Sequence, residues 1–410
     1  MTTTEQRSAI TADAAGFHRF HRVDLPERIA SGNGALAYGD LVKLGTLGLR
    51  CPAGAYTYVP TDGTVEIVEG DALADTVVDL DFDDFVGLAS DLDTAPGLFY
   101  GGRVTVSKGK ALRFVRWEPG LRALFHGRPI FDPETVDLRD RHGEPLDPSR
   151  RFPFESLTDP ELAADATHFL VTAGYVVVSG VFDRDDVASF IEAAGRLEVG
   201  ATPGDRTSWW GRTSDGTEIL NRVLNAATEP DLAALHHDPR VHRVVAVAPD
   251  TLVSRTLDGV HPVTVLWKRP DAAEGLGDLP WHRDCGMGGH ALNCPTTVMT
   301  ICLTDGSPEA GALKALPGSH VGSFPFVDGR DTRAPEGVTM SVAAGDVSLH
   351  YSDVMHASMP PTSDEGPHRI SALLAFAPPV AGHHRGERHY NDVLLGGEGG
   401  QVEHLAHRLG

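Results

Sequence analysis

The sequence has few cysteines, no long apolar run and no excess of basic residues. Its four cysteines have neither the density of a disulfide-stabilised secreted protein nor the C-x-x-C spacing of a redox or zinc motif, which predicts reduced thiols. No apolar stretch approaches the roughly 20 residues of a transmembrane helix. The first residues, MTTTEQRSAI, lack the charged start and apolar core of a signal peptide. These absences predict a cytoplasmic protein without membrane insertion.

The charge balance is strongly acidic. There are 35 Lys and Arg against 57 Asp and Glu, giving a formal net charge of −22. Such a surface disfavours binding to nucleic acid or to an anionic membrane. The length of 410 residues and the 41% hydrophobic content predict two folded domains or one large one. We expect a small-molecule substrate as the partner and no nucleic acid. Formation of a homodimer stays open.

An H-x-D triplet at 282–284 is the main chemical signal. The segment Val263–Lys268 is β-branched and aromatic, which predicts a strand, and Pro280-Trp281 resumes an extended path. Residues i and i+2 of a strand point to the same face. His282 and Asp284 should therefore project together, whereas Arg283 should point away.

A third ligand is available about seventy residues downstream, at His356. We expect the strand Val347–Tyr351, which follows a turn at 344–346, to bring it alongside. Two imidazoles and one carboxylate are the ligand set of non-haem Fe(II) oxygenases. With twenty histidines in the chain, an H-x-D triplet alone could be coincidence. We interpret the nearby His350 as an ordinary strand residue.

Arg369 opens an apolar run, Ile370–Ala377, that predicts a buried strand. A buried guanidinium needs an anionic partner, and its planar fork matches a carboxylate. A structural salt bridge to an acidic residue is one interpretation. Because Arg369 follows His356 by thirteen residues, we favour the other interpretation, the distal carboxylate of 2-oxoglutarate.

Residues 165–380 resemble the phytanoyl-CoA dioxygenase family of Fe(II)/2-oxoglutarate-dependent oxygenases. Four stretches in the family's order carry this resemblance: residues 168–190, P-W-H-R-D at 280–284, LTDGSPEAGALKALPGSH at 303–320, and H-A-S at 356–358 leading to Arg369. The spacing from the distal histidine to the arginine is slightly longer here than is common in the family. The resemblance implies a mainly β fold, a double-stranded β-helix (a cupin-like jelly roll) with flanking helices.

The resemblance also implies roles for individual residues. His282, Asp284 and His356 would bind Fe(II), and Arg369 with Ser358 would bind 2-oxoglutarate. Lys268 is a further co-substrate candidate, with a solvated strand-end lysine as the alternative. No catalytic residue is implied beyond the iron ligands. The implied reaction consumes O2 and releases succinate and CO2. Related halogenases lack the carboxylate ligand, so Asp284 favours hydroxylation or another oxidation over halogenation. The expected substrate is a small hydrophobic or secondary-metabolite molecule.

Substrate contacts are predicted between the opening helices and the metal motif, where relatives often place a lid. Adjacent tryptophans in a polar stretch are typical of a binding wall, although one of them could pack in the core. The candidates are Trp209, Trp210, Arg222, Asn225 and, in the glycine-rich loop, Met287.

The N-terminal part is predicted to be separate. We divide the chain into an α+β accessory domain at 1–130, a linker at 131–160 and the oxygenase domain at 161–410. Its expected elements are three strands, a helix, a strand–turn–strand unit and a closing helix: Tyr56–Pro60, Thr64–Val68, Thr76–Leu80, Asp81–Ser90 and 102–114. This order resembles the sterol-carrier-protein-2-type lipid-binding fold, and a purely structural domain is the alternative.

Two functions of other classes remain open at this stage. One is a cupin-like metal enzyme that does not use 2-oxoglutarate. The other is a lipid-binding or scaffold protein whose oxygenase half is vestigial.

Overall fold

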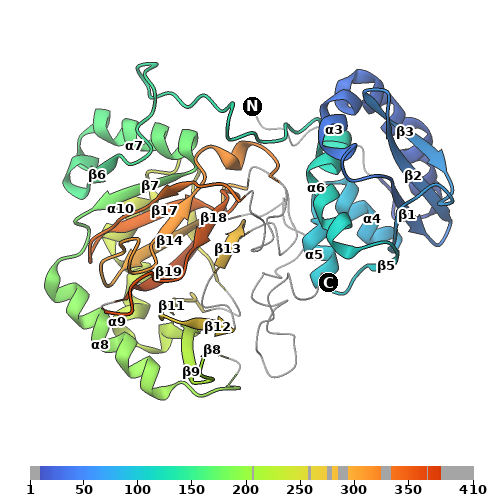
Figure 1. The fold of residues 1–410 in the computed structure, drawn as a ribbon. Helices are drawn as coiled ribbons and strands as arrows, with labels where there is room; N and C mark the ends of the chain where they lie inside the picture. The colour runs from blue at the N-terminus through green and yellow to red at the C-terminus, as the bar shows by residue number, and fades with distance from the viewer. Residues whose placement is uncertain are drawn as a thin grey trace.

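The computed structural model describes residues 10–205, 207–256, 260–274, 279–284, 294–324, 334–366 and 368–379. Within these residues there are two large hydrophobic cores, one between Phe17 and Phe125 and one between Phe152 and Phe376. Figure 1 shows the corresponding regions side by side. Among the described helices, none combines the length and apolarity needed to cross a membrane.

The N-terminal region is a five-stranded sheet covered by helices. The sheet order is β3-β2-β1-β4-β5, and only β1 and β4 pair in parallel. Its strands are β1 Leu47–Cys51, β2 Gly54–Thr61, β3 Thr64–Glu69, β4 Thr76–Asp79 and β5 Thr105–Lys108. Its α-helices are α1 Ala14–Arg19, α2 Leu25–Arg28, α3 Gly34–Leu41, α4 Phe82–Ala89, α5 Ala95–Tyr100 and α6 Ala111–His126.

Most of the elements predicted for this region are confirmed. The three strands are β2, β3 and β4, and the helix is α4, whose N-cap Asp81 accepts a hydrogen bond from the Asp84 N–H at 2.7 Å. The prediction of a second strand at the end of 102–114 was wrong, because Ala111 begins α6. Buried residues of α6 recur at helical spacing, from Phe114 through Trp117 to Leu121, and this periodicity outweighs the short alternation at 111–114.

The C-terminal region has the predicted double-stranded β-helix fold. Its larger sheet runs β12-β8-β9-β11-β19-β14-β17-β7-β6, with β10 also paired to β19, and its smaller sheet runs β13-β18-β15-β16. The larger sheet comprises β6 Arg151–Pro153, β7 Tyr175–Ser179, β8 Ser208–Thr213, β9 Glu218–Val223, β10 Val253–Ser254, β11 Thr264–Trp267, β12 Ala272–Glu274, β14 Thr297–Cys302, β17 Val347–Tyr351 and β19 Ile370–Ala377. The smaller sheet comprises β13 Leu279–His282, β15 Leu313–Ala315, β16 Val338–Thr339 and β18 His356–Ser358.

Helices flank the larger sheet, as predicted. The α-helices are α7 Pro160–Ala173, α8 Arg184–Gly200, α9 Pro230–Ala233 and α10 Pro239–Val245. Apolar side chains of α7, α8 and α10 join the same core as the larger sheet. In Figure 1, α8 lies across the larger sheet from β13. The smaller sheet thus has one face toward the barrel interior and one toward the N-terminal region.

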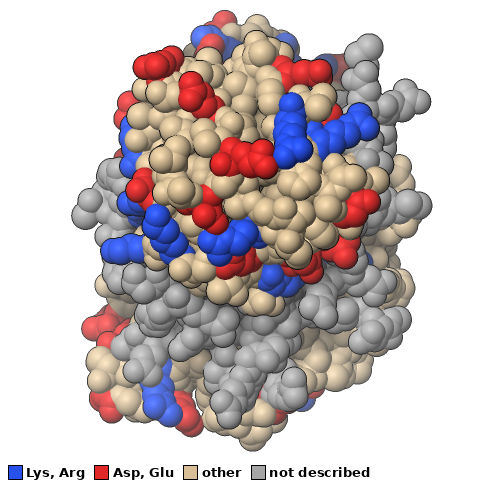
Figure 2. Space-filling model, turned by 90° about the vertical axis from the view of Figure 1, so that its right-hand side faces the viewer, with Lys and Arg blue, Asp and Glu red and all other residues tan. Residues whose placement is uncertain are grey.

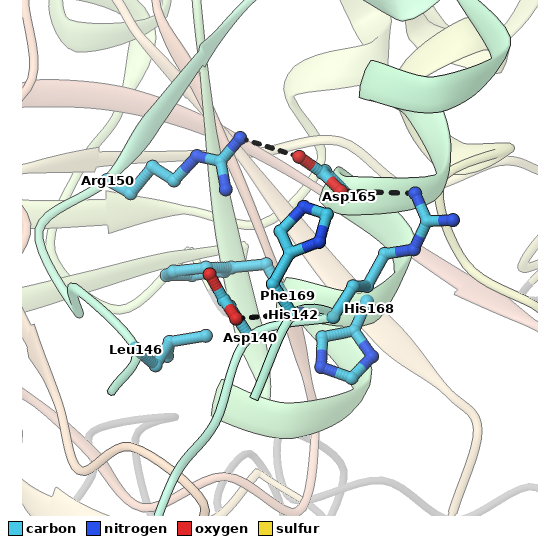
Figure 3. A pocket seen from close by; sticks show the side chains of 8 residues that line it. Asp140, His142, Leu146, Arg150, Asp165, His168 and Phe169 are labelled. Atoms are coloured by element: carbon cyan, nitrogen blue, oxygen red, sulfur yellow. Dashed lines mark hydrogen bonds and ion pairs between the residues drawn. The ribbon is translucent and has the colours of Figure 1, made fainter. Parts of the chain in front are cut away.

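The segment between the two regions packs along the barrel of the C-terminal region. β6 pairs in parallel with β7, and the Tyr175 hydroxyl donates to the Pro148 carbonyl at 2.7 Å. On α7, Asp165 lies between Arg150 and Arg141, with N–O distances of 2.9 and 3.1 Å (Figure 3). These contacts join the segment between the two cores to the barrel.

Figure 2 looks onto the N-terminal region and shows acidic and basic side chains mixed across that face.

The interior of this region contains a buried histidine. His21 is 1% exposed and stacks on Tyr56 with a ring-centroid distance of 4.2 Å. Its Nδ1 lies 2.8 Å from the Phe17 carbonyl, and its Nε2 lies 2.8 Å from the Tyr58 hydroxyl. A neutral ring that donates through Nδ1 and accepts at Nε2 satisfies both partners.

The pH dependence of stability follows from this histidine. Burial lowers the pKa of His21 to about 3, from an ordinary value of 6.5. The folded state therefore disfavours the proton, and the stability that the neutral ring provides should be lost as the pH falls from about 6.5 toward 3. One such group changes the unfolding free energy by at most about 1.4 kcal/mol per pH unit. His21→Gln should remove that slope in denaturant unfolding between pH 6 and 4. The matched control is His142→Gln, at an exposed position, which should keep the slope; equal slopes for His21→Gln and the unmodified protein would contradict the assignment.

Candidate metal centre

The smaller sheet brings the H-x-D triplet and the distal histidine together. β13 and β18 are antiparallel neighbours, and their register places His282 directly opposite His356. Cross-strand partners point to the same face, and so do residues i and i+2 of an extended segment. The expectation that the strand 347–351 carries the third ligand needs correction, because His356 begins the next strand, β18, after a turn.

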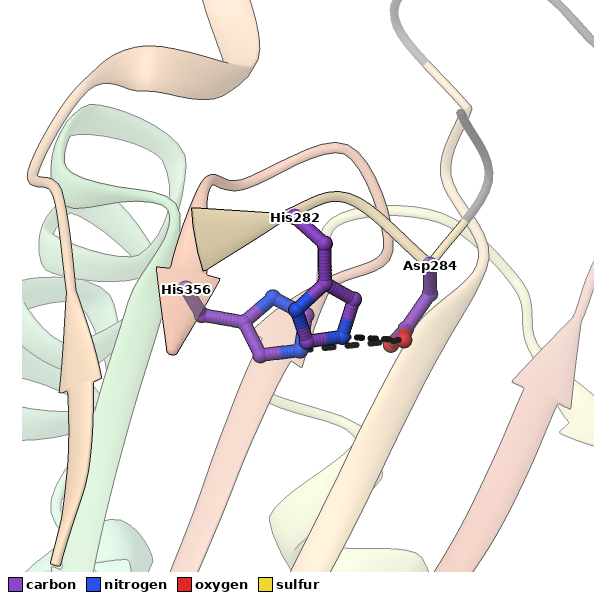
Figure 4. A group of neighbouring side chains, drawn as sticks. All are labelled: His282, Asp284 and His356. Atoms are coloured by element: carbon purple, nitrogen blue, oxygen red, sulfur yellow. Dashed lines mark ion pairs between the residues drawn. The ribbon is translucent and has the colours of Figure 1, made fainter. Parts of the chain in front are cut away.

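The three side chains converge on one point (Figure 4). His282 Nε2 lies 3.5 Å from Asp284 Oδ1, and His356 Nε2 lies 3.7 Å from the same oxygen. One ligand atom from each residue lies within 4.8 Å of the other two. Two neutral nitrogens and one carboxylate oxygen at these separations can hold a divalent cation, with open positions left for other ligands.

The electrostatics of the cluster suit metal ligation. Burial and the neighbouring His282 lower the pKa of His356 to about 3, so its ring is neutral near pH 7. The Nδ1 of His356 lies 3.0 Å from the Val354 carbonyl, which fixes that nitrogen as the donor and leaves Nε2 as the free lone pair. Burial by itself raises the pKa of Asp284, but His356, His282 and His350 together lower it well below its usual value. His356 and Asp284 are therefore deprotonated before any metal binds.

His350 also reaches this cluster, a contact that the sequence did not reveal. It lies on β17, is 2% exposed, and its Nε2 is 3.5 Å from Asp284 Oδ2. Among the described residues, neither of its ring nitrogens has another hydrogen-bond partner. The two carboxylate oxygens of Asp284 are thus divided, with Oδ1 toward His282 and His356 and Oδ2 toward His350. The interpretation of His350 as an ordinary strand residue missed this contact.

Arg369 lies just before β19, and its side chain is buried with 3% exposure. One terminal nitrogen donates to the Ser358 hydroxyl at 2.5 Å, and within the described part of the chain Nε has no hydrogen-bond partner. No acidic side chain among the described residues forms an ion pair with Arg369. Burial, with Arg222 nearby, lowers the pKa of Arg369 to about 10, which leaves it charged near pH 7. A buried guanidinium in this state fits an external carboxylate.

Ser358 and Lys268 complete this cationic end of the site. Ser358 follows His356 by two residues on β18, so the two side chains share a face about 7 Å apart along the strand. Lys268 is 1% exposed, and its Nζ donates to the Ser358 carbonyl at 2.6 Å. The structure therefore places Arg369, Ser358 and Lys268 in one continuous group that adjoins the metal-ligand cluster.

The predicted substrate residues fall at different depths. Trp209 is 1% exposed, and Arg222 stacks on its ring with the guanidinium carbon 4.6 Å from the centroid. Trp210 is half-buried and donates from its indole nitrogen to the Ser208 hydroxyl at 2.8 Å. Asn225 is exposed beyond the end of β9. Met287 lies outside the described residues.

Comparison with known proteins agrees with this geometry. Residues 170–370 match the family model for phytanoyl-CoA dioxygenase (PhyH). This half of the chain belongs to the phytanoyl-CoA dioxygenase family. The His-Asp-His cluster could hold an iron ion, and the buried Arg369 guanidinium could bind a carboxylate such as that of 2-oxoglutarate. No curated protein matches the chain.

Several solved structures are similar to parts of it. EvdMO1 is 24% identical with a TM-score of 0.42, and the match covers 52% of this chain but only 50% of that one. AviO1 from Streptomyces viridochromogenes is 23% identical with a TM-score of 0.40, over 54% of this chain and 98% of that one. EctD from S. alaskensis, solved with 2-oxoglutarate and 5-hydroxyectoine, is 21% identical with a TM-score of 0.43, over 61% of this chain and 86% of that one.

The contact between His350 and Asp284 generates a prediction. Loss of a partner that orients a metal-binding carboxylate typically weakens metal binding about 10- to 100-fold. We expect His350→Leu to weaken Fe(II) binding by that amount in anaerobic calorimetry, and His350→Gln, which keeps an N–H donor, to recover part of the loss. His236→Gln is the control, since His236 is also buried but bonds to the Pro262 carbonyl. Wild-type affinity in His350→Leu would show that the contact does not orient Asp284.

Proposed function

We propose that this chain hydroxylates an unactivated C–H bond of a small molecule, using Fe(II), 2-oxoglutarate and O2. The observation that carries the proposal is the buried Arg369, which has no acidic partner among the described residues and adjoins the His-Asp-His cluster through Ser358. Burial of this guanidinium is costly without an anionic ligand, and the distal carboxylate of 2-oxoglutarate would supply one.

Each residue in the site has a proposed task. His282, Asp284 and His356 would hold iron on one side and leave the opposite side open. Arg369, with the Ser358 hydroxyl, would bind the far carboxylate of 2-oxoglutarate, and Lys268 would support this end through the Ser358 carbonyl. When bound, iron and 2-oxoglutarate supply the oxidising chemistry, in which O2 is consumed, succinate and CO2 are released, and one oxygen atom enters the substrate.

The carboxylate ligand favours hydroxylation over halogenation. Asp284 occupies a position where a halide would otherwise need to bind, and its low pKa keeps it anionic. The barrel contributes positioning, because a rigid pair of strands holds the ligands. A small hydrophobic or secondary-metabolite substrate, with Trp210 and Arg222 near its path, is the corresponding proposal for specificity.

The role of Arg369 can be tested by titration. Fe(II) and then 2-oxoglutarate are added to anaerobic protein while the visible metal-to-ligand charge-transfer band is followed. A hydrogen bond to a charged group is worth about 1.5–3 kcal/mol, so Arg369→Ala should weaken 2-oxoglutarate binding roughly 10- to 100-fold. The affinity of Arg369→Lys for 2-oxoglutarate should lie between those of Arg369→Ala and the unmodified protein, because lysine keeps the charge but not the paired N–H donors of a guanidinium.

A control variant and a metal-ligand variant distinguish loss of 2-oxoglutarate binding from loss of the metal. Arg196→Ala, at an exposed position on α8, should bind 2-oxoglutarate like the unmodified protein. His356→Ala should abolish the band by removing a metal ligand. If Fe(II) binds but 2-oxoglutarate produces no band, the 2-oxoglutarate assignment is wrong and the non-oxygenase metal enzyme becomes the better proposal.

A further inference from the structure

The segment 281–284 alternates between two surroundings. His282 and Asp284 face the metal site, whereas Trp281 and Arg283 face the opposite way. Trp281 is 5% exposed and belongs to a small apolar cluster with Phe131, Leu316, Met355 and Ala357. Arg283 is 7% exposed and donates to Glu118 Oε1 at 2.8 Å. Both outward-facing residues therefore meet side chains from the part of the chain before residue 132.

Glu118 is held firmly on its own side. It lies within α6 and is 4% exposed. Its Oε2 accepts from the Ala95 N–H at 3.1 Å, at the start of α5, and its Oε1 lies 3.5 Å from Arg122. Arg122 in turn pairs with Asp91 at 3.0 Å. The carboxylate is thus fixed by the N-terminal region independently of Arg283.

The chain just after α6 is also held in place. Phe131 N donates to the Ser323 carbonyl at 2.8 Å, and Ser323 N donates to the Pro129 carbonyl at 2.9 Å. These bonds tie the chain just after α6 to the barrel beside the apolar cluster. Arg283 therefore contacts a residue of α6, and Trp281 packs in a cluster that includes Phe131 from the chain just after α6.

A buried ion pair is a poor source of stability but a strong constraint on geometry. Desolvation of both charges offsets most of their attraction, whereas removal of one partner leaves an uncompensated buried charge. Arg283 sits between two metal ligands in sequence, so any rotation of its backbone rotates His282 and Asp284 with it. The contact with Glu118 excludes the rotations that would carry Arg283 away from α6.

We propose that Glu118 is a positioning residue for the metal site: through Arg283 it holds the 282–284 segment with both ligands facing His356. The N-terminal region is then part of the metal-binding unit and not an independent carrier. This inference rests on the proposed function, because it requires that His282 and Asp284 bind the metal. It adds a residue 164 positions before His282 to the determinants of metal affinity.

The test measures metal binding in the full chain. Anaerobic Fe(II) calorimetry and the visible ligand-field bands of the Co(II)-substituted protein report affinity and geometry without any need for turnover. Glu118→Gln keeps the shape and removes the charge. Arg283→Gln breaks the same contact from the oxygenase side and leaves Glu118 with Arg122 and the Ala95 N–H, so it stays informative even if Glu118→Gln fails to fold.

Both variants should weaken Fe(II) binding about 10- to 100-fold and shift the Co(II) bands. The double variant should be no weaker than the single ones, because one contact is lost in each case. Arg283→Lys should recover part of the affinity. The matched control is Asp84→Asn, which removes a buried carboxylate that pairs with Arg103 within the N-terminal region and should leave metal binding and the bands unchanged.

The outcomes separate this inference from the proposed function. If the unmodified protein does not bind Fe(II), the proposed function fails. If it binds Fe(II) and Arg283→Gln binds equally tightly with unshifted bands, the positioning role of Glu118 is wrong. If Asp84→Asn weakens binding as much as Arg283→Gln, the effect is general destabilisation of the N-terminal region, and the inference is again wrong.

Discussion

The antiparallel register of β13 and β18 is the constraint on which the site depends. It places His282 opposite His356, and the two-residue period of an extended chain adds Asp284 to the same side. A slip of one residue would turn His356 to the other face of the smaller sheet and separate the ligands. β18 is also paired with β15, so the ladder on its far side helps to prevent such a slip. The backbone hydrogen bonds between these strands thereby set the geometry of the three metal ligands.

The site is electrostatically divided along β18. At one end Asp284 carries the negative charge among three imidazoles, and at the other Arg369 and Lys268 meet at Ser358. The guanidinium is costly to bury alone, and Arg222 nearby increases that cost. A co-substrate with a metal-chelating end and a distal carboxylate would relieve both ends at once. This reasoning links the metal ligands and the buried arginine, which are separate signals in the sequence.

The sequence predicted those parts of the site that depend on local periodicity. H-x-D in an extended segment, a third histidine and an arginine before an apolar strand are all readable from spacing. The contact between His350 and Asp284 could not be predicted from spacing. The direction of the His350 side chain relative to His356 depends on the turn between β17 and β18. The pair of Arg283 and Glu118 was also hidden, since the partners are 165 residues apart and no repeating pattern connects them. At 111–114, four residues are too few to distinguish strand from helix, and only Trp117 and Leu121 reveal the period of α6.

The interior of the N-terminal region bears on the choice between a carrier and a positioning role. Phe17 and Phe85 meet edge to face at 4.9 Å, and Phe20 and Phe125 meet at 5.2 Å, between the sheet and α6. Aromatic pairs at these distances stabilise the packing of this core. α6 itself contributes Phe114, Trp117 and Leu121 to this core, on either side of Glu118. A well-packed core favours the positioning role, because a carboxylate behind a metal-binding strand must itself be held in place, and Arg283 cannot be positioned more precisely than its partner.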